Sequence, residues 1–426
     1  MPSAIAALSF VAVAPLANAQ GSDLAELKAQ LAALQSKVEE LEKQQKAQVE
    51  SQDRTTDVLA QTRAGVGEWV GRFQWKGDFR FRNENIDQEF VAKERNRDRI
   101  RLRAGFFARV NDTLRVEVQA ATTENFDARS SNQTLTNTNS RKSLELDLAY
   151  AEWQPNANWK ATFGKMRLPW YTTQSFFFDK DVNPEGVALA WQQGPTGVFA
   201  NAYYIDLAER STRADSNMAG GQLGWRGDIA SGLRLTVAGG YFAHNAVQGY
   251  NTVQDTTLPG NAFGNTVGTG AAACRTGIAT CIANDYDIFE VSADLAMTLG
   301  GRPFTVFADY GNNSQAEAFG TTPDGLDTAW ALGFQWGRVT GARTWEIGYI
   351  HQVTEKDALF GQWIDSDFGG GLTDADGGAF RFGYGFGRNF RINATYFLND
   401  LNNDVASANG FDVEYKRLQI DVNMSF

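Results

Sequence analysis

The sequence predicts an all-β transmembrane barrel of about 16 antiparallel strands, preceded by an N-terminal α-helical coiled coil. Three observations lead to this fold class. The C-terminal segment alternates strictly between apolar and polar residues. From Phe73 onward, segments with the same period of two are joined by connections that alternate between short and long. Near the N-terminus, leucines instead recur with a heptad spacing.

The C-terminal segment 418–426 carries the clearest strand pattern. One parity is apolar: Leu418, Ile420, Val422, Met424 and Phe426. The other parity is polar, which is the pattern of a strand with one apolar and one polar face. Taken alone, such a strand could also form the edge of a soluble sandwich. Its aromatic last residue resembles the terminal strand of bacterial outer-membrane barrels, in which the assembly machinery reads an aromatic C-terminus.

Composition agrees with a barrel and disfavours other classes of protein. Past the N-terminus there is no apolar run of the roughly 20 residues that a membrane helix needs, and the mean hydropathy is -0.36. A barrel hides its membrane signal in this way because lipid-facing and lumen-facing residues alternate along each strand. The net charge of -11 argues against nucleic acid as a partner.

Residues 1–19 have the pattern of a secretory signal peptide. An apolar stretch over 4–16 is followed by Ala17-Asn18-Ala19, which has the small residues of a cleavage site. The pattern departs from the usual one because no basic residue precedes Lys28, and a start codon further upstream would account for this. We therefore expect an exported protein.

Residues 20–64 are predicted to form a periplasmic coiled coil, joined to the barrel by a glycine-containing linker at 65–71. Apolar residues recur with spacings of three and four at Leu24, Leu27, Leu31, Leu34, Val38 and Leu41. A single amphipathic helix lying on a surface could also show this periodicity. The narrow seam with charged flanks favours a second copy of the same helix.

Residues 72–426 are predicted to form the barrel. The expected strands lie near 72–83, 96–110, 113–123, 142–154, 158–167, 186–193, 196–207, 217–229, 232–244, 284–299, 302–312, 326–338, 342–355, 376–388, 390–400 and 411–426. Every second connection is a short turn such as Asn111-Asp112, and most of the others are long and polar. Short periplasmic turns and long outer loops are typical of outer-membrane barrels.

The alternation also assigns a row of arginines to the lumen. Charges on the lipid face cost roughly 2–4 kcal/mol each at the bilayer midplane, so the arginines opposite Ile100 and Leu102 must point inward. The same parity predicts a basic wall made by Arg80, Arg82, Arg97, Arg99, Arg101, Arg103, Arg115, Arg381, Arg391 and Arg417. Arg417 is expected beside Arg80 and Arg82. In the alternative, internal ion pairs with Glu117, Glu145 and Asp147 cancel most of this charge.

The connection at 168–185 is unusually aromatic for an outer loop, with Phe176, Phe177 and Phe178 in succession. It follows Gly-Lys-Met-Arg-Leu-Pro at 164–169 and ends in Pro-Glu-Gly at 184–186. Here the chain resembles the trimeric 16-stranded porins of Gram-negative bacteria. The 164–169 stretch is similar to a strand end in the phosphate-selective porin group and its uncharacterised relatives, some of which carry an N-terminal coiled coil.

This resemblance implies an outer-membrane homotrimer for passive diffusion of small hydrophilic solutes and ions. In those porins the third loop folds into the barrel, which would place Asp179, Asp181 and Glu185 opposite the arginines across a constriction. The Pro-Glu-Gly sequence resembles the tip of that loop but lacks its Phe. The exact geometry of the tip is therefore not expected in this chain. Two alternatives stay open, namely a phosphate- or anion-selective porin and a structural tether to peptidoglycan through the coiled coil.

Three further signals concern the chemistry of the chain. Cys274 and Cys281 lie close together in an exported protein, which favours a local disulfide over two free thiols. Asp365, Asp367, Asp374 and Asp376 could bind Ca²⁺, although their spacing fits an ordinary acidic loop better. We expect no metal or other cofactor.

A catalytic role is disfavoured by the scarcity of the side chains it would need. A barrel lipase or protease requires a nucleophile placed next to a base. The only histidines are His244 and His351, and the sequence has no Gly-x-Ser-x-Gly elbow. We therefore expect no enzymatic activity.

Overall fold

The computed structural model describes residues 29, 32–51, 70–124, 127–251, 262–406 and 410–426. The chain divides into two compact units, Met1–Gly71 and Arg72–Phe426. The expected signal peptide at 1–19 and the seam residues Leu24, Leu27 and Leu31 lie outside the described residues.

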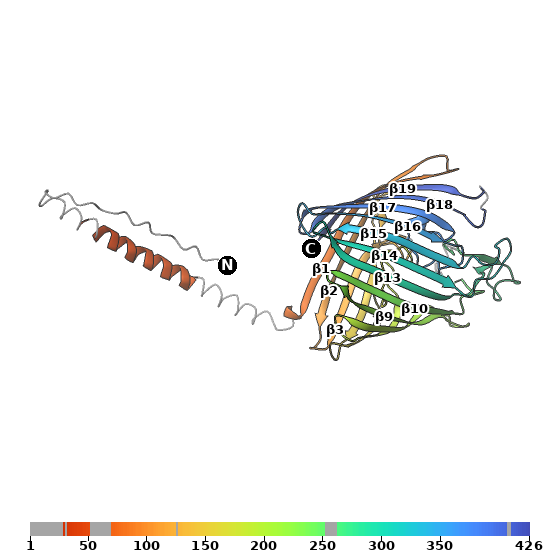
Figure 1. Cartoon of the computed structure of the whole chain (residues 1–426), viewed down its shortest axis with the longest axis horizontal. Coiled ribbons are helices and arrows are strands. Elements are labelled where there is room, and N and C mark those ends of the chain that lie inside the picture. The colour runs from red at the N-terminus through yellow and green to blue at the C-terminus, as the bar shows by residue number, and fades with distance from the viewer. Residues whose placement is uncertain (1–28, 30–31, 52–69, 125–126, 252–261, 407–409) are drawn as a thin grey trace. The chain divides into compact units, whose positions relative to one another are not determined.

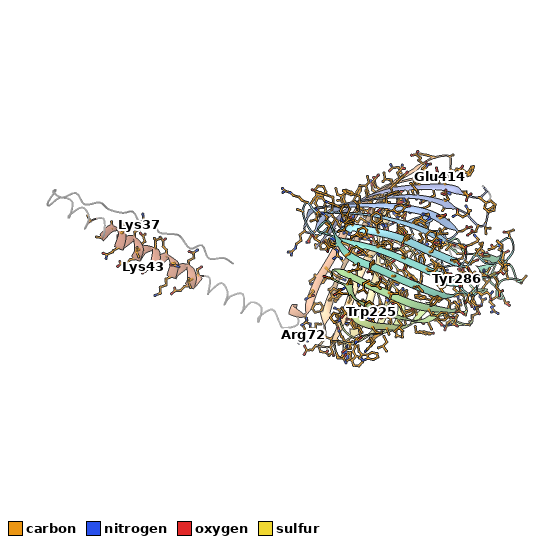
Figure 2. The ribbon with its side chains drawn as sticks, viewed as in Figure 1. Lys37, Lys43, Arg72, Trp225, Tyr286 and Glu414 are labelled. Atoms are coloured by element: carbon orange, nitrogen blue, oxygen red, sulfur yellow. A yellow bond between two sulfur atoms is a disulfide. The ribbon has the colours of Figure 1, made fainter. Side chains whose placement is uncertain are left out.

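Within the described part of the first unit, residues 32–51 form a helix. This stretch is rich in Ala, Leu, Glu, Lys and Gln and has no Gly or Pro, so its residues favour a helix. Three seam residues lie on it and are exposed, Leu34 by 67%, Val38 by 49% and Leu41 by 58%. Lys37 and Lys43 lie on the same helix (Figure 2). No helix in the described part of the chain is long and apolar enough to cross a bilayer.

The second unit is a closed barrel of 16 long antiparallel strands (Figure 1). The wall strands are β1 (Phe73–Gln88), β2 (Arg95–Arg109), β3 (Leu114–Thr123), β5 (Ser143–Trp153), β6 (Trp159–Lys165), β7 (Glu185–Gln192), β8 (Gly197–Ala208), β9 (Ser216–Ala230), β10 (Leu233–Asn245), β13 (Asp287–Leu299), β14 (Arg302–Asn313), β15 (Thr328–Gly337), β16 (Trp345–Thr354), β17 (Ala375–Gly387), β18 (Phe390–Leu401) and β19 (Val413–Ser425). All sixteen predicted strands are confirmed, with ends shifted by a few residues.

Short elements complete the unit. The 3₁₀ turn η1 (Val70–Arg72) precedes β1, and η2 (Phe368–Gly371) lies between β16 and β17. The two-residue strand β4 (Gln133–Thr134) pairs with β2. A separate hairpin of β11 (Val267–Thr269) and β12 (Thr280–Ile282) lies in the longest connection.

The barrel closes where β19 pairs with β1. Their register runs from Asp78 opposite Ser425 to Gln88 opposite Tyr415. Beyond β19, the backbone of Phe426 exchanges two hydrogen bonds with Gly77, of 2.9 and 3.0 Å. A side chain at Gly77 would meet the Phe426 ring at 2.4 Å, so the closure needs glycine here. The C-terminal residue therefore takes part in the pairing of β1 with β19 that closes the barrel.

The predicted faces of β19 are confirmed, but one predicted neighbour is wrong. Leu418 and Ile420 are exposed outward, whereas Arg417 and Asp421 are buried inside. Arg417, however, lies opposite Ile86, and the residue opposite Arg82 is Asp421. The expectation that Arg417 stands beside Arg80 and Arg82 misjudged the register, because period-two alternation fixes the face of a strand but not its offset from its neighbour.

Two long connections fill much of the lumen. Loop 166–184 joins β6 to β7, and loop 355–374 joins β16 to β17. Their buried side chains form one hydrophobic cluster with inward-facing wall residues: Trp170, Phe176, Phe177, Trp363 and Phe368 pack with Ile350, Ala379 and Phe397. The apolar core therefore lies inside the barrel. In Figure 2, Arg72 lies at one end of the barrel, and Tyr286 and Glu414 lie toward the other, where the long loops emerge.

Candidate pore lining

The inner face of β1, β2 and β19 carries a dense ladder of arginines. Arg82 holds Asp421 through two hydrogen bonds, Nε to Oδ1 at 2.6 Å and Nη2 to Oδ2 at 2.8 Å. The same guanidinium reaches Asp367 of loop 355–374 at 2.9 Å. Planar bidentate contacts of this kind are the strongest that an arginine makes with a carboxylate.

Glu84 forms a second centre in the ladder. Its carboxylate is fully buried and lies 2.6 Å from Arg97, 2.9 Å from Arg417 and 3.7 Å from Arg99. Arg417 also contacts Asp367 at 2.7 Å. Burial would raise the pKa of Asp367, but the charges of Arg417 and Arg82 hold it well below its ordinary value. Asp367 therefore stays ionised within this network.

A third centre joins the ladder to loop 166–184. Asp78 on β1 accepts from Arg101 at 2.9 Å and from Arg103 at 2.7 Å. Asp181 of the loop lies 3.4 Å from Arg103 and 3.8 Å from Arg101. Burial alone would raise the pKa of Asp181, but Arg101, Arg80 and Arg103 lower it to about 2. Asp181 is thus a permanent anion against the ladder.

Most of the predicted basic wall is therefore paired with acids. An acid lies within 4.0 Å of eight of the ten arginines: Arg80, Arg82, Arg97, Arg99, Arg101, Arg103, Arg115 and Arg417. Among the described residues, Arg381 and Arg391 have no such partner. The eight arginines are paired internally, but by other acids than the three expected. Glu117 binds Lys76 and Arg167, Asp147 accepts side-chain amides, and Glu145 has no cation within 4.0 Å among the described residues.

Two of the three loop acids expected to face the arginines lie elsewhere. Asp179 is buried and accepts the backbone amides of Ser366 and Asp181, each at 2.8 Å. Burial and the charge of Asp365 raise its pKa. Glu185 begins β7 and pairs with Lys165 at 2.8 Å. Only Asp181 faces the ladder, because strand periodicity carries no information about the path of a loop.

The aromatic residues of loop 166–184 pack within the lumen. Phe176 stacks on Phe368 with ring centroids 5.1 Å apart, and the Arg381 guanidinium lies 4.6 Å from the same ring. Phe177 is only 1% exposed. Phe178 packs edge-on against Trp170 at 5.3 Å. These rings turn what would be a solvent loop into part of the barrel interior.

Loop 355–374 is the part of the lining that sequence reasoning missed. Its Trp363 carbonyl accepts the amide of Asp179 at 2.8 Å. Arg129 of loop 124–142 donates to the carbonyls of Gly361 and Gly371, at 3.2 and 2.8 Å. The available signal was its composition, since Leu359, Phe360, Trp363 and Phe368 are unusual in an exposed acidic loop.

Two hollows of opposite charge lie beside loop 166–184. The acidic hollow, of about 210 Å³, is lined by Asp127, Glu145, Asp147 and Asp181, with Lys165 as its one cation. The basic hollow, of about 290 Å³, is lined by Lys180, Arg381 and Arg391, with Glu346 as its one acid. The lumen thus presents separate regions of negative and positive potential.

The remaining candidate residues lie away from these hollows. Cys274 and Cys281 are joined by a disulfide, with Cα atoms 5.6 Å apart, within the β11–β12 hairpin. The four aspartates weighed as a Ca²⁺ site have separate partners: Asp365 caps the amides of Asp367 and Phe368, Asp367 binds the ladder, Asp374 lies 3.7 Å from Lys356, and Asp376 lies 3.3 Å from His351. They do not converge on one point.

Comparisons with known proteins agree with this architecture. Residues 87–285 match the family model described as "Putative porin". The barrel resembles the high-pH structure of Pseudomonas putida OprB, with a TM-score of 0.56 at 10% identity, covering 84% of this chain and 96% of that chain. It is also similar to Salmonella typhi OmpF in complex with daunomycin, with a TM-score of 0.49 at 12% identity, covering 83% of this chain and 97% of that chain. No curated protein matches. The predicted resemblance to outer-membrane porins is confirmed.

Proposed function

Because residues 87–285 match a porin family and the fold is a porin-like barrel, we propose that this protein is an outer-membrane channel for passive diffusion of small hydrophilic solutes. Loop 166–184 narrows its lumen. The observation that carries this proposal is the set of bonds between that loop and the inner wall. Tyr171 bonds to Gln222 of β9 through its amide and to Asp294 of β13 through its hydroxyl.

Further contacts anchor the loop across the lumen. Thr173 donates to Asp309 of β14, and the amide of Phe176 donates to Gln352 of β16 at 2.9 Å. A loop that starts at β6 and bonds to β14 and β16 must cross the interior. Solutes then pass between fixed polar groups, which set selectivity through pore width and electrostatic barriers.

The charges favour anions on one side of this constriction. The ladder on β1, β2 and β19 is largely neutralised by Asp78, Glu84, Asp367 and Asp421. The cations of the basic hollow have no carboxylate within ion-pair distance in the described part of the chain. A modest anion preference at the constriction is therefore expected, arising from β17 and β18 and not from the ladder.

Planar-bilayer recordings of the purified full chain test the channel itself. The expected result is discrete conductance steps, with a reversal potential in a KCl gradient that reports anion preference. A panel of anions that includes phosphate separates a general channel from a phosphate-selective one. Folded protein that gives no conductance contradicts the proposal, and a strong cation preference contradicts the anion preference.

We further propose that the 20–64 segment assembles the chain as a periplasmic trimeric coiled coil. The exposed Leu34, Val38 and Leu41 on one helix support this, since a narrow apolar seam is best covered by copies of itself. Cross-linking should give a ladder ending at three chains. A ladder that stops at two contradicts the trimer.

Deleting 20–64 separates assembly from the alternative of a peptidoglycan tether. If the segment serves assembly, the deletion abolishes trimers and leaves co-sedimentation with peptidoglycan unchanged. If it tethers the membrane to the cell wall, the deletion abolishes co-sedimentation. The exposed charges of Lys37, Lys43 and Lys46 are available for either contact.

A further inference from the structure

The basic hollow brings together three cations from three separate elements. Lys180 comes from loop 166–184, Arg381 from β17 and Arg391 from β18. Arg381 lies opposite Thr395 and Arg391 opposite Gly385, so the two arginines come from neighbouring strands four residues apart along the wall. Both arginine side chains belong to the inward parity of their strands, and Lys180 approaches from the loop that crosses the lumen.

These cations lack the acids that neutralise the ladder. Among the described residues, no carboxylate oxygen lies within 4.0 Å of a nitrogen of Lys180, Arg381 or Arg391. Arg381 instead donates to the carbonyl of Gln174 at 3.3 Å and lies over the ring of Phe176. Lys180 and Arg391 are exposed and line the hollow. Like charges held together in this way repel one another unless an anion enters.

The only acid that lines the hollow is already engaged. Oε2 of Glu346 accepts the backbone amide of Val339 at 3.1 Å and the side-chain amide of Gln335 at 3.4 Å. These contacts hold it toward the β15–β16 turn. The remaining lining includes neutral polar groups, among them Asn393 and Thr395. The hollow therefore offers two guanidinium forks, an ammonium group and neutral hydrogen-bonding groups.

We infer that the basic hollow is a binding site for small oxyanions, carboxylate or phosphate, on the path through the channel. This inference rests on the proposed channel function and names the solute class for one part of it. Arginine forks match the paired oxygens of carboxylates and phosphates, and lysine adds a mobile point charge. The volume of about 290 Å³ admits a small anion with part of its hydration shell.

The acidic hollow differs from the basic hollow in the sign of its unpaired charges. Glu145 and Asp147 of β5 and Asp127 of loop 124–142 line it together with Asp181. Asp127 pairs with Arg129 at 3.2 Å and Asp181 with Arg103 at 3.4 Å, whereas Glu145 and Asp147 have no cation within 4.0 Å among the described residues. These two carboxylates repel an anion, which the cations of β17 and β18 attract. Anions entering the lumen therefore concentrate on the Lys180 side of loop 166–184.

Single-channel block by oxyanions tests the site. Full-length protein in planar bilayers carries chloride current from KCl, and inorganic phosphate or succinate is added in separate arms. In each arm the chloride current should fall with a saturable dependence on the added anion. The double variant Lys180→Gln/Arg391→Gln should raise the half-blocking concentration at least about tenfold, and Arg391→Lys should raise it less because the charge remains.

A second double variant, which removes two cations elsewhere in the protein, is the control. Lys142→Gln/Arg234→Gln removes one half-buried and one exposed cation outside the hollow, and Arg234 is paired with Asp228 at 3.0 Å. This variant should keep the wild-type half-blocking concentration. Saturable block by phosphate alone, by succinate alone or by both supports the site and identifies its preferred oxyanion.

Two outcomes overturn the inference. One is a wild-type current that shows no saturable block in either arm, and the other is an unchanged half-blocking concentration in Lys180→Gln/Arg391→Gln. In both cases the channel still conducts, so the proposed function survives. Loss of the proposed function is a different result, because folded wild-type protein would then give no conductance in KCl alone.

Discussion

Two groups of cations share the lumen of this barrel but differ in their surroundings. On β1, β2 and β19, each arginine of the ladder meets at least one acid, and Glu84 alone contacts three of them. On β17, β18 and the facing loop, Arg381, Arg391 and Lys180 have no carboxylate within ion-pair distance in the described part of the chain. The number of arginines on a pore wall therefore does not give the electrostatic potential of that wall.

The difference assigns the two groups different roles. Buried paired charges hold the loops in place, because removing one partner leaves the other charge desolvated and alone. Asp367 binds Arg82 and Arg417 and so ties loop 355–374 to the wall. Unpaired cations in an aqueous lumen keep a field that acts on solutes. Under the proposed function, the ladder holds the loops in place and the basic hollow acts on solutes.

Removing Asp367 should have the largest effect on stability. Asp367→Ala leaves Arg82 and Arg417 without one of their buried partners, and breaking a buried pair costs about 3–5 kcal/mol. The free energy of unfolding, measured in urea with the barrel in detergent, should fall by an amount in this range. Arg391→Ala, from the basic hollow, is the control. It should change the free energy of unfolding little, because the Arg391 side chain is exposed and unpaired.

The bidentate contact between Arg82 and Asp421 should show strong coupling. A double-mutant cycle with Arg82→Gln and Asp421→Asn isolates the pairwise interaction, which for residues of one network is about 0.5–3 kcal/mol. The cycle is measured by the same urea unfolding. A coupling energy near zero would mean that the ladder is not held by its acids and would remove the distinction between the two groups.

The charge of Asp181 predicts a pH dependence. Its pKa falls from 3.8 to about 2, so the stabilisation from its contacts is fully present above about pH 4 and is lost as pH falls through 2. The difference in unfolding free energy between wild type and Asp181→Asn should be constant from pH 8 to 5 and should shrink below pH 4. A difference that already shrinks between pH 7 and 5 contradicts the lowered pKa.

The smallest effect is expected at Lys165 and Glu185. This pair of 2.8 Å is exposed on its carboxylate side, and such surface pairs contribute about 0–1 kcal/mol. Glu185→Gln should therefore leave stability and reversal potential almost unchanged. A large shift in the reversal potential would restore Glu185 to the constriction, where the family resemblance had placed it.

The wall of the barrel could be predicted from the sequence because its signals are local. Alternation along Leu418 to Phe426 fixes two faces within one strand, and short turns such as Asn111-Asp112 mark where strands reverse. The exposed Leu418 and buried Arg417 confirm those faces. The strand count follows from the same period and needs no knowledge of distant contacts.

The partners of the charged side chains could not be predicted because they come from far along the chain. Arg82 meets Asp421 and Asp367, which are 339 and 285 residues away. Their meeting depends on the offset between β1 and β19 and on the path of loop 355–374. Asp179 and Asp181 are two residues apart, yet one caps backbone amides and the other faces arginines. The two residues share one parity, so an alternating pattern cannot distinguish their roles.

The reversal potential in a KCl gradient tests most directly which cations set the selectivity. Arg101→Gln/Asp78→Asn removes a cation and an acid from the ladder, and Arg103 keeps Asp181 as its partner. Lys180→Gln/Arg391→Gln removes two of the three unpaired cations. The first variant should keep the wild-type reversal potential, and the second should shift it toward cation preference. The opposite pattern, with a shift in the first variant and none in the second, would contradict the central role of the basic hollow.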